Sequence, residues 1–349
     1  MRDVRIALNI CTYHRERQLL RNLELLLQSR FFDRNQERYY GRLHIYVVDN
    51  ASTLRLPKNP FLHLLHNRNT GGSGGFQKGL ERIRTAQPAF THVVFMDDDV
   101  TFRLEAFYLL YDFLVGAGEE DRDRPVAGRM LDAARPTIQW TAAEIWNGGD
   151  VRHIEFLRDI TKTNVAGEEY RYGRVNRTCE ADYGGWWFCC YPMSFAGQND
   201  ILPFFLHCDD VEYGLRCGKR PILIEGVQVW HETWEKKMSP AMVYYDTRNA
   251  LLVNERYGLL PPPEETLRRW KEKITKYHVE RRWAEEYAVI CGLRDFLKGM
   301  EWLYRIDAER WHKRISGGRG GRIRNAVAWR VVERRFRKRF GMGKGCENG

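Results

Sequence analysis

Three consecutive carboxylates, Asp97, Asp98 and Asp99, follow the short apolar run 93–96. Adjacent carboxylates at the end of a buried strand repel one another, and a bound cation compensates that repulsion. Mg²⁺ and Mn²⁺ prefer oxygen ligands, which they commonly share with the diphosphate of a substrate. The triplet therefore predicts a site for a metal ion and a nucleotide, with an ordinary acidic turn as the alternative.

A second acidic group, Asp209 and Asp210, lies between apolar residues and a helix-like segment. An Asp at the start of a helix can simply cap that helix. A paired Asp that faces the first acidic group can instead act as a general base. His231 ends the strand-like run 227–230. A lone His there is usually structural, but beside a carboxylate site it becomes a candidate third metal ligand.

The glycine-rich stretch 69–75 matches neither a P-loop nor a dinucleotide-binding fingerprint. Its glycines indicate a close approach of the backbone to a neighbour and a helix from about residue 76, with a flexible loop as the alternative. Trp186 and Trp187 follow two further glycines. Core packing is the usual role of Trp, but an indole pair in an irregular region is also what a sugar-binding platform needs.

The elements that must position these groups are short apolar runs at 4–10, 43–48, 62–65 and 92–96, which alternate with helix-like segments. This alternation predicts an α/β fold with a largely parallel sheet. Ligands of such sheets bind at the carboxyl ends of the strands. Polar groups follow all four strands, and we expect them on one edge of the sheet: Thr12 and Arg15, Asp49 and Asn50, the stretch 67–75, and the acidic triplet.

The chain has 349 residues, of which 43% are hydrophobic, enough for one large domain with an appendage or for two domains. The proline run 261–263 indicates a boundary, so we expect a catalytic domain at 1–255 and a basic, mainly helical region at 256–349. Residues 256–349 hold 24 Lys and Arg against 12 Asp and Glu. Such a basic surface suggests nucleic acid or anionic lipid, with a solvated helical face as the alternative.

One helical face near the C-terminus, formed by Trp329, Val332, Phe336 and Phe340, is flanked by Arg and Lys. This pattern is typical of an interfacial helix on an anionic membrane, with packing on the body of the protein or on a partner subunit as alternatives. The N-terminus lacks the features of a signal peptide, and the cysteines form no disulfide or zinc pattern. We therefore expect a cytoplasmic protein. Peripheral contact with the inner face of the cell membrane and a homo-oligomeric state are left open.

The ordered motifs resemble the family-2 inverting glycosyltransferases of GT-A fold, in particular the bacterial galactofuranosyltransferases. The resemblance covers about residues 4–235. Its motifs are Thr12-x-x-Arg15, Asp49-Asn50, Asn69-x-Gly71-Gly72-Ser73-Gly74-Gly75, Asp97-Asp98-Asp99, Trp186-Trp187, Asp209-Asp210-x-x-Tyr213-Gly214 and Trp230-His231.

The resemblance implies transfer of a sugar from a nucleotide-sugar donor, with UDP-galactofuranose favoured, to a glycan or lipid-linked acceptor in the presence of Mn²⁺ or Mg²⁺. Rhamnosyltransferases that use dTDP-rhamnose are the alternative within this class. A nucleic-acid-binding protein is a distant third alternative, because it leaves both acidic groups unexplained. Polymerising relatives carry a further N-terminal β-domain, and this chain starts at the first catalytic strand. We therefore expect the addition of one or a few sugars.

The resemblance also assigns roles to residues. The metal ligands would be Asp97, Asp99 and His231. Asp210 would be the general base, Asp209 would orient the acceptor, and Trp186 and Trp187 would form the acceptor platform. The donor would be bound by Thr12, Arg15, Asp49, Asn50, Asn69, Gly71, Gly72 and Asp98.

Overall fold

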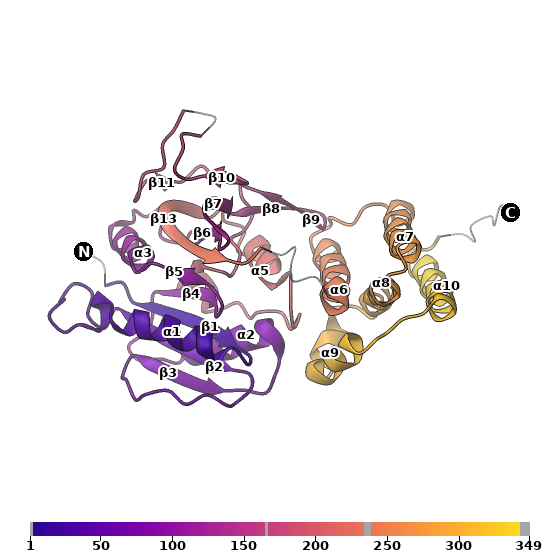
Figure 1. The fold of residues 1–349 in the computed structure, drawn as a ribbon, viewed down its shortest axis with the longest axis horizontal. Coiled ribbons are helices and arrows are strands. Elements are labelled where there is room, and N and C mark those ends of the chain that lie inside the picture. Colours follow the sequence, from indigo (N-terminus) through magenta and orange to yellow (C-terminus); the bar gives the residue numbers. More distant parts are fainter. Residues whose placement is uncertain (1–2, 165–166, 234–238, 343–349) are drawn as a thin grey trace. The chain divides into compact units, whose positions relative to one another are not determined.

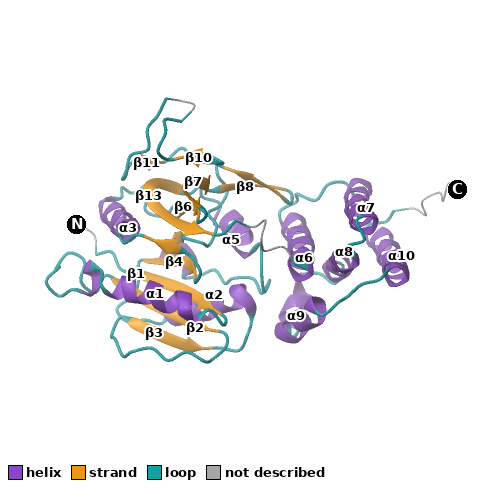
Figure 2. Cartoon of the chain, in the orientation of Figure 1, coloured by secondary structure: helices purple, strands orange, loops and turns teal. Residues whose placement is uncertain are grey.

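The computed structural model describes residues 3–164, 167–233 and 239–342, which divide into two compact units. The first unit consists of Met1–Asn147, Val151–Leu202 and Asp209–Lys236. The second consists of Gly148–Asp150, Pro203–Cys208 and Lys237–Gly349. Figures 1 and 2 show that the large sheet belongs to the first unit and that the second unit is mainly helical.

Four parallel strands in the order β3-β2-β1-β4 form one half of the large sheet of the first unit. In this register Thr12 lies opposite Asp49, and Cys11 lies opposite Asp97. The polar groups that follow these strands therefore share one edge, as the sequence predicts. The strands are β1 (Ile6–Thr12), β2 (Leu43–Asp49), β3 (Leu62–His66) and β4 (His92–Asp97).

The other half of the sheet is mixed and continues from β4 in the order β12-β6-β7-β10. In addition, β13 runs parallel to β6 and pairs antiparallel with β5 and β11. Strands β8 (Glu144–Asn147) and β9 (Asp150–His153) form a separate ribbon. The remaining strands are β5 (Thr101–Phe102), β6 (Val126–Asp132), β7 (Arg135–Thr141), β10 (Arg158–Asp159), β11 (Val175–Asn176), β12 (Cys189–Pro192) and β13 (Ile222–His231).

Helices cover both faces of this sheet. Alternate residues of β1 point to opposite faces, so that Ile6 and Leu8 join one core cluster and Ala7 joins the other. The first cluster includes apolar residues of α1 (Glu16–Leu27) and α3 (Glu105–Gly116). The second includes residues of α2 (Gly71–Arg84) and α5 (Asp209–Cys217). The predicted α/β fold with parallel central strands is confirmed.

The glycine-rich stretch is part of a helix, which corrects the expected helix start at about residue 76. Helix α2 begins at Gly71. A Cβ on Gly75 would lie 2.1 Å from Cys11 Sγ, and a Cβ on Gly79 would lie 2.0 Å from Asn9 Oδ1. Glycine is therefore required where α2 lies directly on β1, and tertiary packing outweighs its low helix propensity.

The second unit is built from helices α6 (Pro240–Arg256), α7 (Pro263–Val279), α8 (Trp283–Phe296), α9 (Ala308–Ser316) and α10 (Arg322–Arg339). It starts earlier than the expected boundary at 256, because α6 packs closely on α8. A Cβ on Gly292 of α8 would lie 2.7 Å from Thr247 Cβ of α6. The proline run that suggested a boundary lies inside this unit, where Pro263 begins α7.

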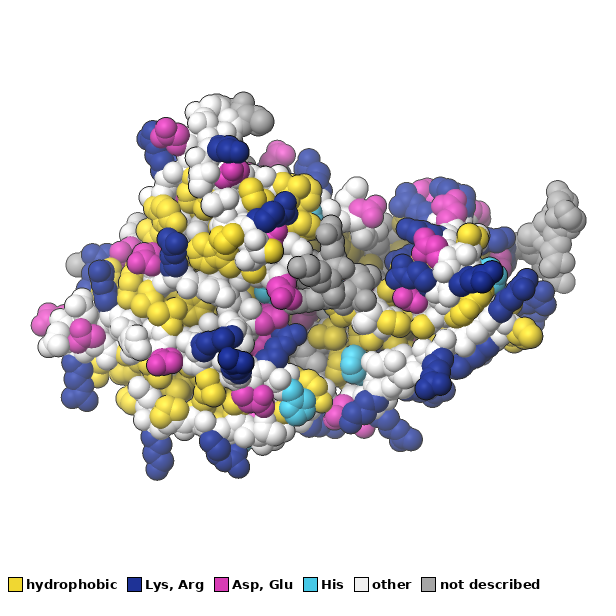
Figure 3. Space-filling view, in the orientation of Figure 1, with side chains coloured by type: hydrophobic (Ala, Val, Ile, Leu, Met, Phe, Trp, Pro, Cys, Tyr) yellow, Lys and Arg dark blue, Asp and Glu magenta, His cyan; other side chains and the backbone are white. Residues whose placement is uncertain are grey.

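The predicted membrane-facing side of α10 packs inward, which corrects that interpretation. Val332 and Phe336 are buried, and the ring of Phe340 stacks on Phe296 of α8. A different stripe of α10, formed by Ile323, Val327 and Val331, is exposed. Lys and Arg side chains, dark blue in Figure 3, are numerous over the helices of this unit. Among the residues that the structure describes, no helix is long and apolar enough to cross a bilayer.

Candidate active site

The predicted metal ligands lie together in the first unit. Asp97 ends β4, Asp99 follows two residues later, and His231 ends β13. Antiparallel pairing of Thr101 in β5 with Trp230 in β13 brings the chain after the triplet alongside His231. One ligand atom from each of the three side chains lies within 4.8 Å of the others. His231 Nε2 is 3.0 Å from Asp99 Oδ1 and 3.8 Å from Asp97 Oδ2.

The orientation of the His231 ring suits a metal ligand. Its Nδ1 is 2.7 Å from the carbonyl oxygen of Glu232, which can only accept a hydrogen bond, so Nδ1 carries the hydrogen. Nε2 therefore presents its lone pair to the carboxylates when the ring is neutral. A backbone carbonyl that fixes the far nitrogen is a common arrangement around metal-bound His. Two carboxylates and one imidazole fit a divalent cation such as Mn²⁺.

The electrostatics of Asp97 also favour a cation. Burial raises the pKa of Asp97 to about 7, the neighbouring His231 lowers it, and the carboxylates of Asp99 and Asp98 raise it further. The side chain still keeps 40% of its surface exposed. Without a cation, the raised pKa favours the protonated form of Asp97, and a bound divalent cation would favour its ionised form instead.

Asp98, the middle residue of the triplet, is braced by two predicted donor-binding residues. Thr12 Oγ1 donates to Asp98 Oδ2 at 2.6 Å, and Arg15 donates to Asp98 Oδ1 at 2.9 Å. The same Arg15 nitrogen lies 2.9 Å from Asp99 Oδ2. Burial raises the pKa of Asp98, and Arg15 and Thr12 oppose this shift. Asp98 is only 4% exposed, so in this structure it anchors the triplet instead of facing a ligand.

The other predicted donor-binding residues shape the loops beside the strand ends. The buried Asp49 carboxylate accepts from the backbone N–H groups of Ala51 and Leu54, at 2.9 and 2.7 Å. Asn50 donates to the Gly71 carbonyl at 2.8 Å. Asn69 Oδ1 accepts from Gly71 N–H at the start of α2. Gly72 follows within the first turn of α2 and is partly exposed. Asp49 and Asn50 thus lie at the expected edge, but their side chains are buried and bonded to the protein.

The second acidic group begins helix α5. Asp209 Oδ2 accepts from Ser73 Oγ at 2.8 Å, and Asp210 Oδ1 accepts from the N–H of Val211. The pKa of Asp210 is raised well above the ordinary value, first by burial and then by the charges of Asp209, Glu144 and Asp97. The influence of Asp97 means that the two acidic groups lie within electrostatic reach of each other. A raised pKa makes the ionised carboxylate of Asp210 a stronger base.

The predicted acceptor platform is not supported, because both indoles belong to the core. Trp186 and Trp187 are 4% and 5% exposed. Trp186 stacks on Phe95 with 4.5 Å between ring centroids, and Trp187 Nε1 donates to the Gly128 carbonyl at 2.7 Å. A Cβ on Gly185 would lie 2.1 Å from the Trp187 ring. The adjacent glycine therefore makes room for an indole and not for a sugar.

The structure also adds residues that the sequence interpretation missed. Ser73, which orients Asp209, is fully buried in the first turn of α2. A lone hydroxyl among four glycines could have signalled this role. Glu144, which raises the pKa of Asp210, lies 2.9 Å from His153 across the ribbon of β8 and β9. No motif surrounds Glu144, so only the tertiary structure identifies it.

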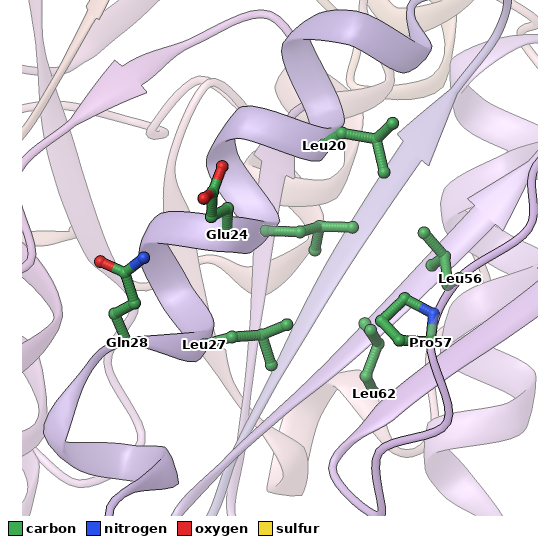
Figure 4. A pocket seen from close by; sticks show the side chains of 8 residues that line it. Leu20, Glu24, Leu27, Gln28, Leu56, Pro57 and Leu62 are labelled. Carbon is green, nitrogen blue, oxygen red and sulfur yellow. The ribbon is translucent and has the colours of Figure 1, made fainter.

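A separate hollow of about 370 Å³ lies beside α1 (Figure 4). None of the predicted site residues lines it. Its walls are mainly aliphatic, and Glu24 is the one ionisable side chain among the residues that line it. The lining residues are Leu20, Leu23, Glu24, Leu27, Gln28, Leu56, Pro57 and Leu62.

Part of this chain is similar to known glycosyltransferases. Residues 8–121 match the family model described as Glycosyl transferase family 2. The chain is 28% identical over 267 residues to the galactofuranosyltransferase GlfT2 of Mycolicibacterium smegmatis, which covers 69% of this chain and 39% of that protein. It is 28% identical over 282 residues to GlfT2 of Mycobacterium tuberculosis, which covers 73% of this chain and 41% of that protein.

The chain thus spans about two fifths of the length of these curated relatives. Among solved structures, a mannosyltransferase from Pyrobaculum calidifontis in complex with GDP-mannose and Mn²⁺ superposes with a TM-score of 0.43 at 12% identity, over 97% of this chain and 83% of that one. The family match covers the strands that carry the acidic triplet and the donor-side residues. The part of the chain that carries the acidic triplet is therefore similar to glycosyl transferase family 2, the family that its motifs resemble.

Proposed function

We propose that this protein is a metal-dependent, inverting glycosyltransferase that moves galactofuranose from UDP-galactofuranose to a hydroxyl of a glycan or lipid-linked acceptor. One observation carries the proposal. A ligand set of Asp97, Asp99 and His231 lies within electrostatic reach of Asp210, a half-buried carboxylate with a raised pKa. The similarity to two galactofuranosyltransferases supports the choice of donor.

Asp210 is the base in this proposal. Its carboxylate takes the proton of the acceptor hydroxyl while the hydroxyl oxygen forms a bond to the anomeric carbon of the donor. The bond from that carbon to the diphosphate breaks in the same displacement, and the bonding electrons leave with UDP. Because attack and departure occur on opposite faces, the anomeric configuration inverts. Asp209, held by Ser73, orients the acceptor.

In this proposal the nucleotide-sugar donor is bound at the acidic triplet. Arg15 and Thr12 hold Asp98, which keeps Asp97 and Asp99 on the side of His231. When bound by these three ligands, Mn²⁺ or Mg²⁺ supplies neutralisation of the charge that develops on the leaving diphosphate. Arg15 keeps half of its side chain exposed and can place a second positive charge near the same phosphates.

The test is a donor panel with a lipid-linked galactan acceptor, read by mass spectrometry and by the released nucleotide. We expect UDP release and the addition of hexose with UDP-galactofuranose, and no product with GDP-mannose or UDP-galactopyranose. Deoxyhexose addition from dTDP-rhamnose would replace the donor assignment. No transfer from any donor would overturn the proposed function.

We also propose that α10 contacts anionic membrane through its exposed stripe. Ile323, Val327 and Val331 are 81%, 57% and 45% exposed and lie four residues apart, on one side of the helix. Three exposed cations, Arg330, Arg334 and Lys338, lie on nearly the same side of the helix, about two turns further along. An apolar stripe next to a cationic row is what binds the surface of an anionic bilayer.

Vesicle flotation tests this contact. Changing Ile323, Val327 and Val331 together to Ser should lower binding to phosphatidylglycerol vesicles by about 5-fold or more. The control is Val279→Ser, which changes a 76% exposed valine at the end of α7 and should leave binding unchanged. Equal binding of the triple variant and the wild type would contradict the membrane contact.

A further inference from the structure

Strand β13, which ends in the proposed metal ligand His231, contains a large bulge. Leu223 lies opposite Ala127 of the parallel strand β6. The next paired residue of β13 is Gln228, and it lies opposite Arg129, so β13 advances five residues where β6 advances two. From Gln228 to His231 the pairing is regular again. Three extra residues are thus inserted, and an odd insertion turns every later side chain to the other face of the strand.

The core contacts of β13 reflect this change of face. Before the bulge, the even-numbered Ile222 and Ile224 belong to the first core cluster. After the bulge, the odd-numbered Val227 and Val229 belong to that cluster. His231 has the parity of the second pair, so without the bulge its imidazole would start from the opposite face of the strand. The bulge therefore decides whether the ring can meet the two carboxylates of the metal site.

The bulge needs support from outside the strand. Its Gly226 has a φ angle of 98°, which only glycine adopts readily, and a Cβ there would lie 2.5 Å from the Tyr172 ring and 2.6 Å from Leu109. Glu225 beside it carries a carboxylate and is only 2% exposed. A buried charge and an interrupted ladder of hydrogen bonds are both unfavourable unless neighbours supply partners. The bulge therefore has to be held by contacts with other segments.

The segment before β11 supplies most of these contacts. Strand β11 pairs antiparallel with β13 and lies beside it in Figure 1. The Glu225 carboxylate accepts from the Arg171 N–H, from the Arg174 guanidinium at 2.6 Å and from Arg158 at 3.2 Å. The backbone of Glu225 is also bonded on both sides, because its carbonyl accepts from Gly173 N–H and its N–H donates to the Arg174 carbonyl, at 2.7 and 2.9 Å. The bulge is thus fixed by a side chain and by its backbone.

The hydroxyl of Tyr170 bridges the two sides of the bulge. It accepts from the Gly226 N–H at 2.8 Å and donates to Oε1 of Gln228, the residue at which pairing with β6 resumes. The guanidinium carbons of Arg129 and Arg158 lie 5.8 and 5.3 Å from the centroid of the Tyr170 ring. Burial raises the pKa of Tyr170 to about 12, so the hydroxyl keeps its proton and remains a donor at neutral pH.

We call Tyr170, Arg174 and Glu225 the bulge lock, and all three lie in the first unit together with His231. We propose that the bulge lock positions His231 as a metal ligand. By fixing the inserted residues, it sets the register at which β13 resumes its pairing, and with it the face from which the imidazole extends. The members of the bulge lock are positioning residues that touch no reacting atom. The inference rests on the proposed function, in which His231 is one of three ligands of the cation.

The first test is a double-mutant cycle on Mn²⁺ binding, measured by calorimetry and by the loss of the free Mn²⁺ signal in electron paramagnetic resonance. Tyr170→Phe keeps the ring but removes the hydroxyl bridge. It should weaken Mn²⁺ binding by about 5-fold or more, because the apparent affinity falls with the fraction of molecules that hold the competent register. In a His231→Ala background, the same substitution should change the remaining affinity by less than about 2-fold. Equal losses in both backgrounds would overturn the inference, since they indicate a merely structural role.

A matched control lies in the same unit. Tyr111 of α3 is buried, and its hydroxyl donates to the Arg38 carbonyl at 2.9 Å, away from the bulge of β13. Tyr111→Phe also removes a tyrosine hydroxyl from a hydrogen bond to the backbone. It should lower the melting temperature about as much as Tyr170→Phe while leaving Mn²⁺ binding within about 2-fold. A loss of Mn²⁺ affinity equal to that of Tyr170→Phe would overturn a specific lock.

The second test follows the bulge itself and needs neither metal nor activity. Hydrogen exchange of the amides of residues 224–228 should become about 5-fold faster or more in Tyr170→Phe, while the amides of β1 keep their wild-type rates. Unchanged exchange in the bulge would overturn the lock even if the enzyme is active. If exchange and Mn²⁺ binding respond as expected but the wild type transfers no sugar from any donor, the proposed function fails and the bulge lock remains as the device that positions a metal ligand.

Discussion

The two acidic groups of the first unit are held in different ways. Asp97, Asp98 and Asp99 end a strand inside the sheet, and they are cross-braced by Thr12, by Arg15 and by His231. Asp209 and Asp210 begin a helix directly after a segment with left-handed residues. The first group is surrounded by cationic and hydroxyl donors, whereas further carboxylates raise the pKa of Asp210.

This difference suits the two acidic groups to different tasks, cation binding at the triplet and proton transfer at Asp210. Cationic neighbours and convergent ligand atoms prepare the triplet to share charge with a cation and a diphosphate. Burial and like charges prepare Asp210 to gain and lose a proton. A strand end has its direction set by the hydrogen bonds of the sheet. A helix start after an irregular segment depends on side chains from elsewhere, such as Ser73.

The largest effect is expected from removal of the proposed general base. Asp210→Asn should lower kcat by about 10²- to 10⁴-fold, the usual range for loss of a general base. UDP and Mn²⁺ binding, measured by calorimetry, should stay within about 2-fold because the triplet is untouched. A fully active variant would remove Asp210 from the role of base.

The second largest effect is expected from removal of a proposed metal ligand. His231→Ala should weaken Mn²⁺ binding by about 10- to 100-fold or more, because it removes a ligand from a set of three. Excess Mn²⁺ should restore part of the turnover. In the wild type, EDTA should abolish transfer, and Mn²⁺ or Mg²⁺ should bring it back. Undiminished transfer in chelator would show that the cluster of Asp97, Asp99 and His231 serves no catalytic cation.

A smaller effect is expected from two hydroxyl groups, one of which donates to each acidic group. Ser73→Ala removes the bond to Asp209 and should lower kcat by about 5- to 10-fold with unchanged Mn²⁺ affinity. Thr12→Val removes the bond to the buried Asp98, and should instead weaken Mn²⁺ and donor binding by a similar factor. Calorimetry and steady-state kinetics on both variants distinguish the two sides. Identical profiles would mean that the two groups do not act separately.

The smallest effect concerns stability and pH. In the folded, metal-free protein the pKa of Asp97 is about 7, against about 3.9 for an unfolded Asp. Between these values the folded state binds more protons than the unfolded state, so this residue makes stability fall as pH rises. Because the side chain is 40% exposed, solvent screens the effect, and we expect a change of only a few degrees.

Thermal denaturation in EDTA at pH 5 and pH 8 measures this contribution. Asp97→Asn should raise the melting temperature relative to the wild type more at pH 8 than at pH 5, because the variant carries no charge to bury. Mn²⁺ should stabilise the wild type at pH 8 and have a weaker effect on the variant. A difference between the two proteins that does not depend on pH would contradict the raised pKa of Asp97.

Local sequence patterns were sufficient to predict the parallel strands of the first unit. The strands begin and end within about two residues of the predicted runs, because alternation and apolar runs report burial along one strand. The start of α2 was missed, since a run of glycines predicts no helix when Cys11 and Asn9 beneath it are not known. The apolar face of α10 was recognised, but whether it meets lipid or α8 depends on a partner that is distant in sequence.

The sequence by itself determined the α/β class, the polar groups at the strand ends, the candidate metal ligands and the concentration of positive charge after residue 255. These properties depend on residue type and on short-range periodicity. Only the tertiary structure decided that Asp99 meets His231 across 132 positions, that both indoles are buried, and that Tyr170 bridges the bulge of β13. Such contacts depend on the packing free energy of the whole unit, which no local window of sequence contains.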